Sequence, residues 1–242
     1  MEHFVEETQI KDYVVQNIPL TLEINKHIFP PSKHGSLISD NVKIRPRENV
    51  IDIGTGSGII AIYAAKKGAN VFATDIDNDA IETTKRNARR NNVNIQCSVG
   101  SFFAEFQRKF DIIIANLPQE IVPKDYQKII GKQLTRSMDG GKEGNEVLLK
   151  FLDTAKDFMH EKTKLYVPVY TVSDYKTTFQ KIINNYDAKL IAFDSRPTKE
   201  FVGVYKEFFL KLKEEGKAYL YFKNGQWFAD IYLFELKLKR DA

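Results

Sequence analysis

Short apolar runs alternate along the chain with segments in which apolar residues recur every three or four positions. The first pattern is typical of buried strands, and the second is typical of helices with one buried face. The predicted strands span residues 50–53, 71–74, 94–99, 110–117, 164–170 and 189–193, and the predicted helices span 59–67, 78–91, 145–160 and 173–185. This alternation predicts an α/β fold with a doubly wound, mostly parallel sheet that carries helices on both faces.

The C-terminal region departs from this alternation. Asn224-Gly225 separates two aromatic-rich runs, 219–222 and 227–238, and this pattern predicts an antiparallel hairpin. We expect this C-terminal hairpin to edge a seven-stranded sheet. Just before it, apolar residues at helical spacing predict a helical insertion at 197–216.

The N-terminal residues also stand apart from the alternating region. A strand-like run lies at 20–24, and prolines break the chain at 30–31. We interpret residues 1–45 as an N-terminal extension and gate, followed by one doubly wound domain at 46–242.

Composition narrows the class of protein. The chain has 242 residues, of which 43% are hydrophobic and 28% charged, as in ordinary globular proteins. The single cysteine excludes a disulfide within the chain, and His3, His27 and His160 lack metal-ligand spacing, so no metal site is predicted. No apolar run reaches 18 residues, and the acidic start lacks a signal-peptide core. We therefore expect a cytoplasmic protein without a membrane partner.

A glycine-rich turn joins the first predicted strand to the first predicted helix. Gly54, Gly56 and Gly58 allow a tight turn and the close approach of a ligand, and the free N–H groups of the helix start face the same space. Asp75 ends the next strand, where a carboxylate can accept hydrogen bonds from two ribose hydroxyls. The loop lacks the Lys-Ser or Lys-Thr of a phosphate-binding Walker loop.

Residues 50–62 resemble the cofactor loop of the class I S-adenosylmethionine-dependent methyltransferases, and residues 72–77 resemble their second motif. The resemblance extends over residues 28–195 and implies a Rossmann-like domain with S-adenosylmethionine as its cofactor. It implies that the glycines pass the methionine part, that Asp52 orders the amino group and that Asp75 binds the ribose. The implied cofactor-binding residues are Asp52, Gly54, Thr55, Gly56, Gly58, Asp75, Ile76 (on the adenine), Ser101 (at the adenine edge) and Asn116.

The end of the fourth predicted strand resembles the Asn-Pro-Pro-Tyr motif of methyltransferases that modify planar nitrogens. Here the motif reads Asn116, Leu117, Pro118 and Gln119, and these four residues are the catalytic candidates. By the resemblance, the Asn116 side chain and the Leu117 carbonyl hold the N–H groups of the acceptor and orient its nitrogen. Gln119 replaces the aromatic residue, which removes a stacking platform and adds an amide.

Two further segments favour one subfamily. Residues 139–146 resemble a glycine-rich segment of the release-factor glutamine methyltransferases, and residues 28–35 resemble the proline-containing gate of that family. The resemblance implies methyl transfer to a nitrogen acceptor, namely a glutamine side chain of a protein. A small-molecule methyltransferase, an RNA-adenine methyltransferase and a non-catalytic S-adenosylmethionine-binding protein remain alternatives.

The charge balance bears on these alternatives. The net charge is +4, from 36 Lys and Arg against 32 Asp and Glu. Many of the basic residues lie at 85–90 and 206–217, and neither stretch is expected to form a long basic stripe beside Asn116. We therefore expect a protein or small-molecule acceptor rather than a nucleic acid. The oligomeric state stays open.

Overall fold

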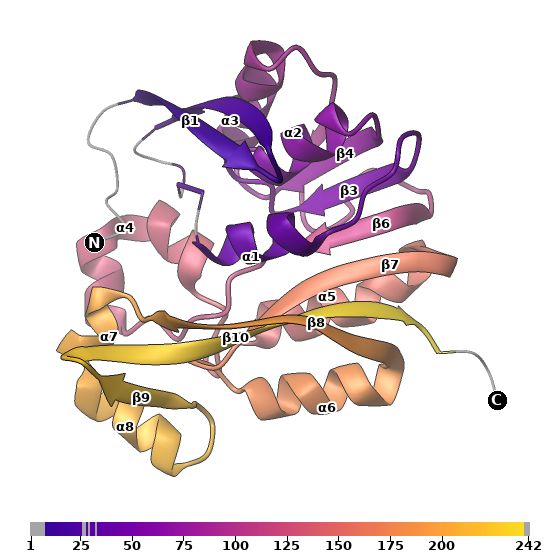
Figure 1. Cartoon of the computed structure of the whole chain (residues 1–242). Helices are drawn as coiled ribbons and strands as arrows, with labels where there is room; N and C mark the ends of the chain where they lie inside the picture. The colour runs from indigo at the N-terminus through magenta and orange to yellow at the C-terminus, as the bar shows by residue number, and fades with distance from the viewer. Residues whose placement is uncertain (1–7, 26–27, 29, 32, 240–242) are drawn as a thin grey trace.

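The computed structural model describes residues 8–25, 28, 30–31 and 33–239, without the side chains of Lys33 and His34. Its central sheet confirms the predicted α/β fold (Figure 1). The strands follow one another across the sheet in the order β5 (Gln96–Val99), β4 (Asn70–Asp75), β3 (Asn49–Ile53), β6 (Phe110–Ala115), β7 (Met159–Tyr170), β10 (Gln226–Leu238) and β8 (Tyr186–Pro197). The first five are parallel, and β10 is antiparallel to both of its neighbours.

The C-terminal hairpin forms, but it does not lie at the edge of the sheet as expected, and the described residues form eight strands in this sheet instead of the predicted seven. It consists of β9 (Leu220–Lys223) and β10, and β10 lies between β7 and β8. Residues 228–238 of β10 pair with β8 on one side, while residues 226–229 pair with β9 and residues 231–236 with β7 on the other. With 13 residues, β10 is long enough to pair with all three strands.

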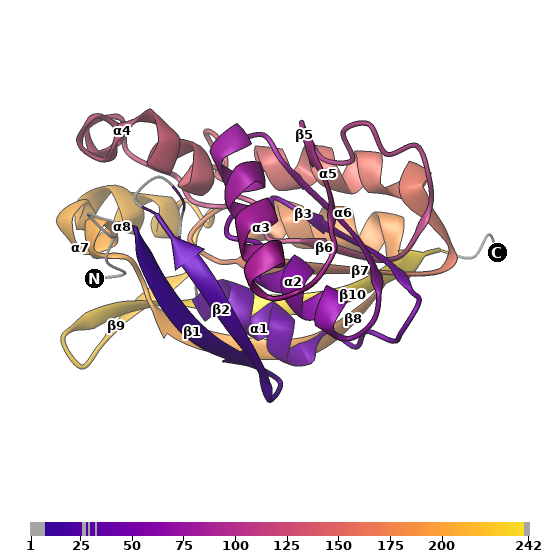
Figure 2. The ribbon, with the colours of Figure 1, turned by 90° about the horizontal axis from the view of Figure 1, so that it is seen from above.

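Helices cover both faces of the sheet. One face carries α1 (Lys33–Asn41), α2 (Ile59–Lys66) and α3 (Asn78–Arg90), and the other carries α5 (Glu146–Ala155) and α6 (Tyr175–Asn185) (Figures 1 and 2). Side chains of β6 alternate between the two cores: Ile112 and Ile114 pack in the first, and Ile113 and Ala115 pack in the second. This alternation confirms that β6 is a central strand with two apolar faces.

Two N-terminal strands form a separate two-stranded sheet. β1 (Gln9–Val15) pairs antiparallel with β2 (Ile18–Ile24), and β2 packs on α2 and α3 away from the central sheet (Figure 2). We call this unit the N-terminal hairpin. The sequence pattern indicated β2 but missed β1, whose residues are mostly exposed and therefore carry little apolar signal.

The helix predicted at 145–160 is too long at its C-terminal end. α5 ends at Ala155, a 3-10 turn spans Lys156–Phe158, and β7 starts at Met159. Met159 pairs with Phe110 of β6 and is fully buried, so pairing in the sheet overrides continuation of the helix.

Three helices surround the carboxyl ends of the strands. α4 (Lys124–Met138) was not predicted, because Met138 is its one buried residue and no apolar face marks it in the sequence. α7 (Glu200–Val204) and α8 (Lys206–Glu214) form the predicted insertion, in which Phe201, Val202, Phe209 and Leu212 are buried. Among the described residues, no helix is long and apolar enough to cross a membrane.

Candidate functional site

A cavity of about 650 Å³ lies at the carboxyl ends of β3, β4 and β6. Parallel strands bring their carboxyl ends to one edge of the sheet, where ligands of doubly wound folds bind. Every residue singled out from the sequence lines the cavity except Gly58: Asp52, Gly54, Thr55, Gly56, Asp75, Ile76, Ser101, Asn116, Leu117, Pro118 and Gln119. Residues 52–57, 75–77 and 100–102 form what we call the glycine-loop wall. Residues 116–120, with residues of α4 and Lys199, form the Asn116 wall.

The glycine loop turns through left-handed backbone conformations. Gly54 has a φ of 72° and Gly56 has a φ of 55°, which side-chain-bearing residues rarely adopt. A Cβ atom at Gly56 would meet nothing within 4 Å, so the absent side chain leaves open space. A Cβ atom at Gly54 would lie 3.4 Å from Leu117 Cδ2. The glycine loop therefore lies directly beside the Asn116 wall.

Gly58 does not line the cavity. It precedes α2 with a φ of 84°, and a Cβ atom there would lie 3.0 Å from two side-chain atoms of Thr84 on α3. Its missing side chain allows close approach of α3 instead of contact with a ligand.

Two carboxylates stand at the glycine-loop wall. Asp52 is buried and accepts a hydrogen bond from the Thr55 hydroxyl at 2.8 Å, and burial raises its pKa to about 7. Asp75 accepts hydrogen bonds from the backbone N–H groups of Gly56 at 3.0 Å and Asp77 at 2.9 Å. Burial raises the pKa of Asp75 as well. The Asp75 carboxylate thus fixes the glycine loop from the end of the neighbouring strand.

The same wall carries an exposed apolar side chain. Ile76, a large hydrophobic residue that lines the cavity, is 51% exposed. Ser101 and Phe102 line the cavity from the loop after β5, and Phe102 was not singled out from the sequence. Together these three residues offer an apolar and a polar surface to a flat ring.

Asn116 and Leu117 directly follow β6 and carry free polar groups. Among the described residues, no side chain or backbone group hydrogen-bonds to the Asn116 amide or to the Leu117 carbonyl. Both residues line the cavity, and a Cβ atom at Gly54 would lie 3.8 Å from the Asn116 carbonyl oxygen. An amide and a carbonyl are therefore available to a ligand between the two walls.

Gln119 lies in the Asn116 wall, but its amide is already used. Its Nε2 donates to the Pro168 carbonyl at 2.9 Å, and its Oε1 accepts from the Tyr170 N–H at 3.2 Å. The side chain is buried and pairs with the backbone of β7 much as another strand would. Gln119 therefore anchors the Asn116 motif to β7.

Segments distant in the sequence complete the Asn116 wall. Glu120 is buried and forms an ion pair with Lys199 of the insertion at 2.8 Å. The C-terminal half of α4 lines the cavity, and Gln133 donates to the Asp77 carboxylate at 2.8 Å, which joins α4 to the glycine-loop wall. Tyr170, at the end of β7, also lines the cavity.

The segments that favoured one subfamily occupy different places. Ile28, Pro30, Pro31 and Gly35 of the predicted gate line the cavity, whereas Phe29 and Ser32 lie outside the described residues. In the segment 139–146, Asp139 lines the cavity, and Gly140 packs behind Pro118. A Cβ atom at Gly140 would lie 2.8 Å from the Pro118 carbonyl oxygen and 2.1 Å from that of Gly144. This glycine-rich segment supports the Asn116 motif from behind.

The histidines give no metal centre in the part of the chain that is described. His160 contacts Asp111 at 3.1 Å, whereas His3 and His27 lie outside the described residues. No group of three or more His, Cys, Asp or Glu side chains gathers among the residues that the structure covers.

Relatives by sequence are methyltransferases. A family model for ribosomal protein L11 methyltransferases matches residues 34–135. A Methanocaldococcus jannaschii protein named "Putative protein N5-glutamine methyltransferase" is 29% identical over 164 residues, which are 67% of this chain and 82% of that relative. A ribosomal protein L11 methyltransferase of Caldicellulosiruptor saccharolyticus is 49% identical over 82 residues, so the chain spans only 27% of that relative's length.

Solved methyltransferases share the fold over nearly the whole chain. The T. thermophilus 16S rRNA N2 G1207 methyltransferase, in complex with AdoMet and guanosine, superposes with a TM-score of 0.60 over 97% of this chain and 52% of that chain, at 13% identity. Trm5b of Pyrococcus abyssi gives a TM-score of 0.57 at 17% identity, over 97% of this chain and 57% of that chain. The matched family model and the relatives by sequence are thus methyltransferases, and the fold is one that solved methyltransferases share, in agreement with the enzyme class predicted from the sequence.

Proposed function

We propose that the chain binds S-adenosylmethionine at the glycine-loop wall and methylates a glutamine side-chain nitrogen of a protein. The free Asn116 amide and the free Leu117 carbonyl, side by side at the cavity and beside Gly54, carry this proposal. The archaeal relative's name and the glycine-rich segment behind Pro118 support the choice of acceptor.

The glycine-loop wall fits the cofactor residue by residue. The open space at Gly56 accommodates the methionine part, and the buried Asp52 carboxylate offers a partner for its positive amino group. The Asp75 carboxylate can accept hydrogen bonds from ribose hydroxyls in addition to those from the backbone. The exposed Ile76 side chain would cover the adenine, with Ser101 at its edge. When bound, the cofactor supplies an electrophilic methyl group.

The Asn116 wall fits a planar amide acceptor. A primary amide presents two N–H donors, and the Asn116 side-chain oxygen and the Leu117 carbonyl are two free acceptors at adjacent residues. Held by both, the amide nitrogen is oriented, and orientation accounts for much of the rate of a displacement reaction. Gln119 does not take the place of an aromatic platform in this arrangement, because its amide is bound to β7.

A labelled-methyl assay tests the proposal. Purified release factor and ribosomal protein L11 are incubated with the chain and methyl-labelled S-adenosylmethionine, and a complete enzymatic digest is examined for labelled N5-methylglutamine, which acid hydrolysis would release as methylamine. Asn116→Ala should lower the rate of labelling about 100-fold while cofactor affinity stays the same, because a misplaced acceptor costs about that factor. Absence of N5-methylglutamine with wild type, or full labelling by Asn116→Ala, would contradict this acceptor.

Cofactor binding is tested separately. Asp75→Ala should weaken S-adenosylhomocysteine binding by about tenfold or more, since it removes charged hydrogen bonds to the ribose and to the glycine loop. Isothermal titration gives the Kd directly. Equal affinities of wild type and Asp75→Ala would remove the cofactor site from this wall.

A second acceptor class, RNA, is favoured by one observation. Lys132 and Arg136 lie one turn apart on α4 and line the cavity together with Lys150 of α5, and none of the three has an ion-pair partner among the described residues. These cations lie outside both basic stretches on which the expectation against nucleic acid rested. Three basic side chains therefore line the same cavity as Asn116, which the order of residues in the sequence did not indicate.

Salt dependence separates the two acceptor classes. If RNA is the acceptor, its log affinity should fall steeply with log salt, and each of Lys132→Gln, Arg136→Gln and Lys150→Gln should lower that slope by about 1. A peptide that carries the target glutamine should show a shallow salt dependence and should become labelled. Labelling of transfer or ribosomal RNA without labelling of either protein would favour the second class.

A further inference from the structure

The helix α3 contacts the glycine loop from behind, on the side away from the cavity. The Thr84 hydroxyl donates to the Gly56 carbonyl at 3.1 Å, and the Asn87 Nδ2 donates to the Ser57 carbonyl at 2.9 Å. Both α3 side chains are fully buried. Two consecutive carbonyls of the loop are therefore held by side chains of one helix.

These two hydrogen bonds fix the orientation of the loop peptides. In a trans peptide the N–H points opposite to the preceding C=O. The Gly56 carbonyl points at Thr84, so the Ser57 N–H points away from α3, toward the side on which residues 54–57 line the cavity. The Ser57 carbonyl points at Asn87, and the following Gly58 N–H donates to the Thr55 carbonyl at 2.9 Å. α3 thus holds the loop in the conformation in which residues 54–57 line the cavity.

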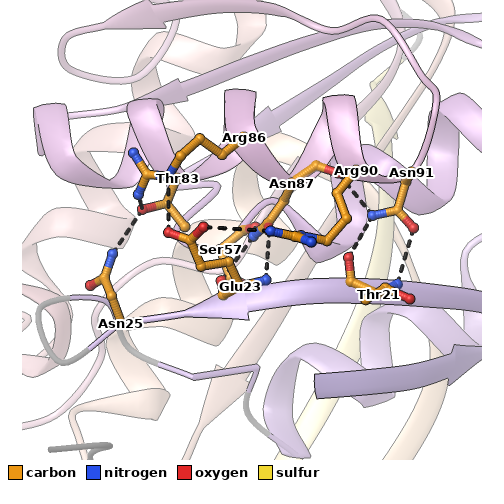
Figure 3. A network of polar contacts seen from close by, with 9 residues as sticks. All are labelled: Thr21, Glu23, Asn25, Ser57, Thr83, Arg86, Asn87, Arg90 and Asn91. Atoms are coloured by element: carbon orange, nitrogen blue, oxygen red, sulfur yellow. Dashed lines mark hydrogen bonds and ion pairs between the residues drawn. The ribbon is translucent and has the colours of Figure 1, made fainter. Parts of the chain in front are cut away.

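Asn87 also joins α3 to the N-terminal hairpin (Figure 3). Its Oδ1 accepts from the Glu23 N–H at 2.7 Å, and its Nδ2 donates to the Glu23 carbonyl at 3.0 Å. Asn91, one turn later, forms the same pair with Thr21, at 3.0 Å and 2.7 Å. Four helical residues rise about 6 Å and two strand residues about 6.6 Å, so the two amides match alternate residues of β2.

The two asparagines differ in one respect. Asn87 contacts both β2 and the glycine loop, whereas Asn91 contacts β2 and the α3 backbone but makes no hydrogen bond to the loop. Replacing Asn91 therefore tests what the hydrogen bonds to the docked hairpin contribute, without a change at the loop. Replacing Asn87 tests the same contribution together with the loss of the hydrogen bond to the loop.

We propose that Thr84 and Asn87 are positioning residues for the cofactor loop, and that Asn87 couples the loop to the docked N-terminal hairpin. The inference rests on the proposed cofactor site at the glycine-loop wall. Neither side chain lines the cavity, so each acts on the cofactor only through the backbone of the loop.

The test compares Asn87→Ala with Asn91→Ala as a matched control. Both variants lose two hydrogen bonds to β2 and should lose thermal stability to a similar degree. Only Asn87→Ala should weaken S-adenosylhomocysteine binding, by about tenfold, which corresponds to one buried hydrogen bond. In steady-state assays the KM for S-adenosylmethionine should rise in Asn87→Ala, while the KM for the acceptor stays unchanged.

Two further variants separate positioning from packing. Thr84→Val keeps the volume of the side chain and leaves the hairpin contacts intact, and it should weaken cofactor binding and shift the amide resonances of Gly56 and Ser57. Asn87→Asp keeps the shape and the acceptor for the Glu23 N–H but cannot donate to Ser57, and it should bind no better than Asn87→Ala. If Asn87→Ala does not fold, Thr84→Val still tests whether α3 positions the cofactor loop.

The outcomes distinguish this inference from the proposed site. If Asp75→Ala weakens cofactor binding but Asn87→Ala and Asn91→Ala bind equally well and Thr84→Val binds like wild type, the positioning role is wrong and the site stands. If Asp75→Ala also binds like wild type, the cofactor site itself is wrong.

Discussion

The two walls of the cavity are built in different ways. The glycine-loop wall comes largely from one short stretch, residues 52–57, and depends on backbone conformation and two carboxylates. The Asn116 wall is assembled from β6, α4 and the insertion, and depends on side-chain contacts such as those between Glu120 and Lys199 and between Gln119 and β7. A wall made from contiguous backbone can be inferred from a motif, and so can residues 116–119 of the other wall, whereas the distant side chains that complete the Asn116 wall cannot.

The largest expected effect lies in the Asn116 wall. Lys199→Met removes the ion pair between Lys199 and the buried Glu120 carboxylate, and we expect a loss of about 3 kcal/mol in the free energy of unfolding. Urea denaturation measures it. Lys199→Met combined with Glu120→Gln should recover part of the loss, and a double variant no more stable than the single one would show that the ion pair is not the cause.

The next largest effect concerns Gln119. Gln119→Leu removes the buried hydrogen bonds to the Pro168 carbonyl and the Tyr170 N–H, and the loss of both should cost about 2 kcal/mol of stability. The rate of methyl transfer should fall as well, while cofactor Kd stays near the wild-type value. Wild-type stability in this variant would mean that Gln119 is not an anchor.

We expect the affinity for the cofactor to depend on pH through Asp52 of the glycine-loop wall. Burial raises the pKa of Asp52 from 3.8 to about 7, so below pH 7 the carboxyl is mostly neutral and is a poor partner for a positive amino group. Cofactor affinity should therefore rise with pH up to about 7, by at most about tenfold per unit. Titration calorimetry from pH 5 to 8 measures this, and Asp52→Asn should flatten the profile.

The titration of the Asp52 carboxyl should also change the free energy of unfolding with pH. The folded chain holds the Asp52 proton more tightly than the unfolded chain does, because the folded-state pKa is raised. The free energy of unfolding should therefore fall as pH rises from about 4 to about 7, and Asp52→Asn should lack this contribution. If the contribution of Asp52 to the free energy of unfolding rose with pH between about 4 and about 7, Asp52 would not be a buried, neutral group.

The smallest effect on stability is expected at Gly56. Gly56→Ala introduces a side chain at a φ of 55° but meets no neighbour within 4 Å, so the strain alone should cost about 1 kcal/mol. The methyl group enters the open space of the cavity, so cofactor affinity should fall more than stability does. Unchanged affinity would show that the cofactor does not approach this glycine.

Sequence pattern and motif determined much of the fold and of the glycine-loop wall. Apolar runs predicted the parallel strands, because a central strand buries both faces and reads as a continuous apolar run. The glycines and Asp75 predicted one wall of the cavity, because a strand, a tight turn and a helix in direct succession fix where their residues lie. Whether residues 1–45 and 46–242 are separate units, and which roles the site residues play, stay predictions.

Only the tertiary structure decided the rest. It placed β10 inside the sheet, Gln119 on β7, Lys199 beside Glu120, and the cations of α4 and α5 at the cavity. It also showed that Asn87 joins the glycine loop to β2, residues separated by more than thirty positions in the chain. Local pattern reports which face of an element is buried, but not which distant element covers it. Which distant elements meet is decided by packing of the whole chain. This packing brings α4 and the insertion to residues 116–120 in the Asn116 wall.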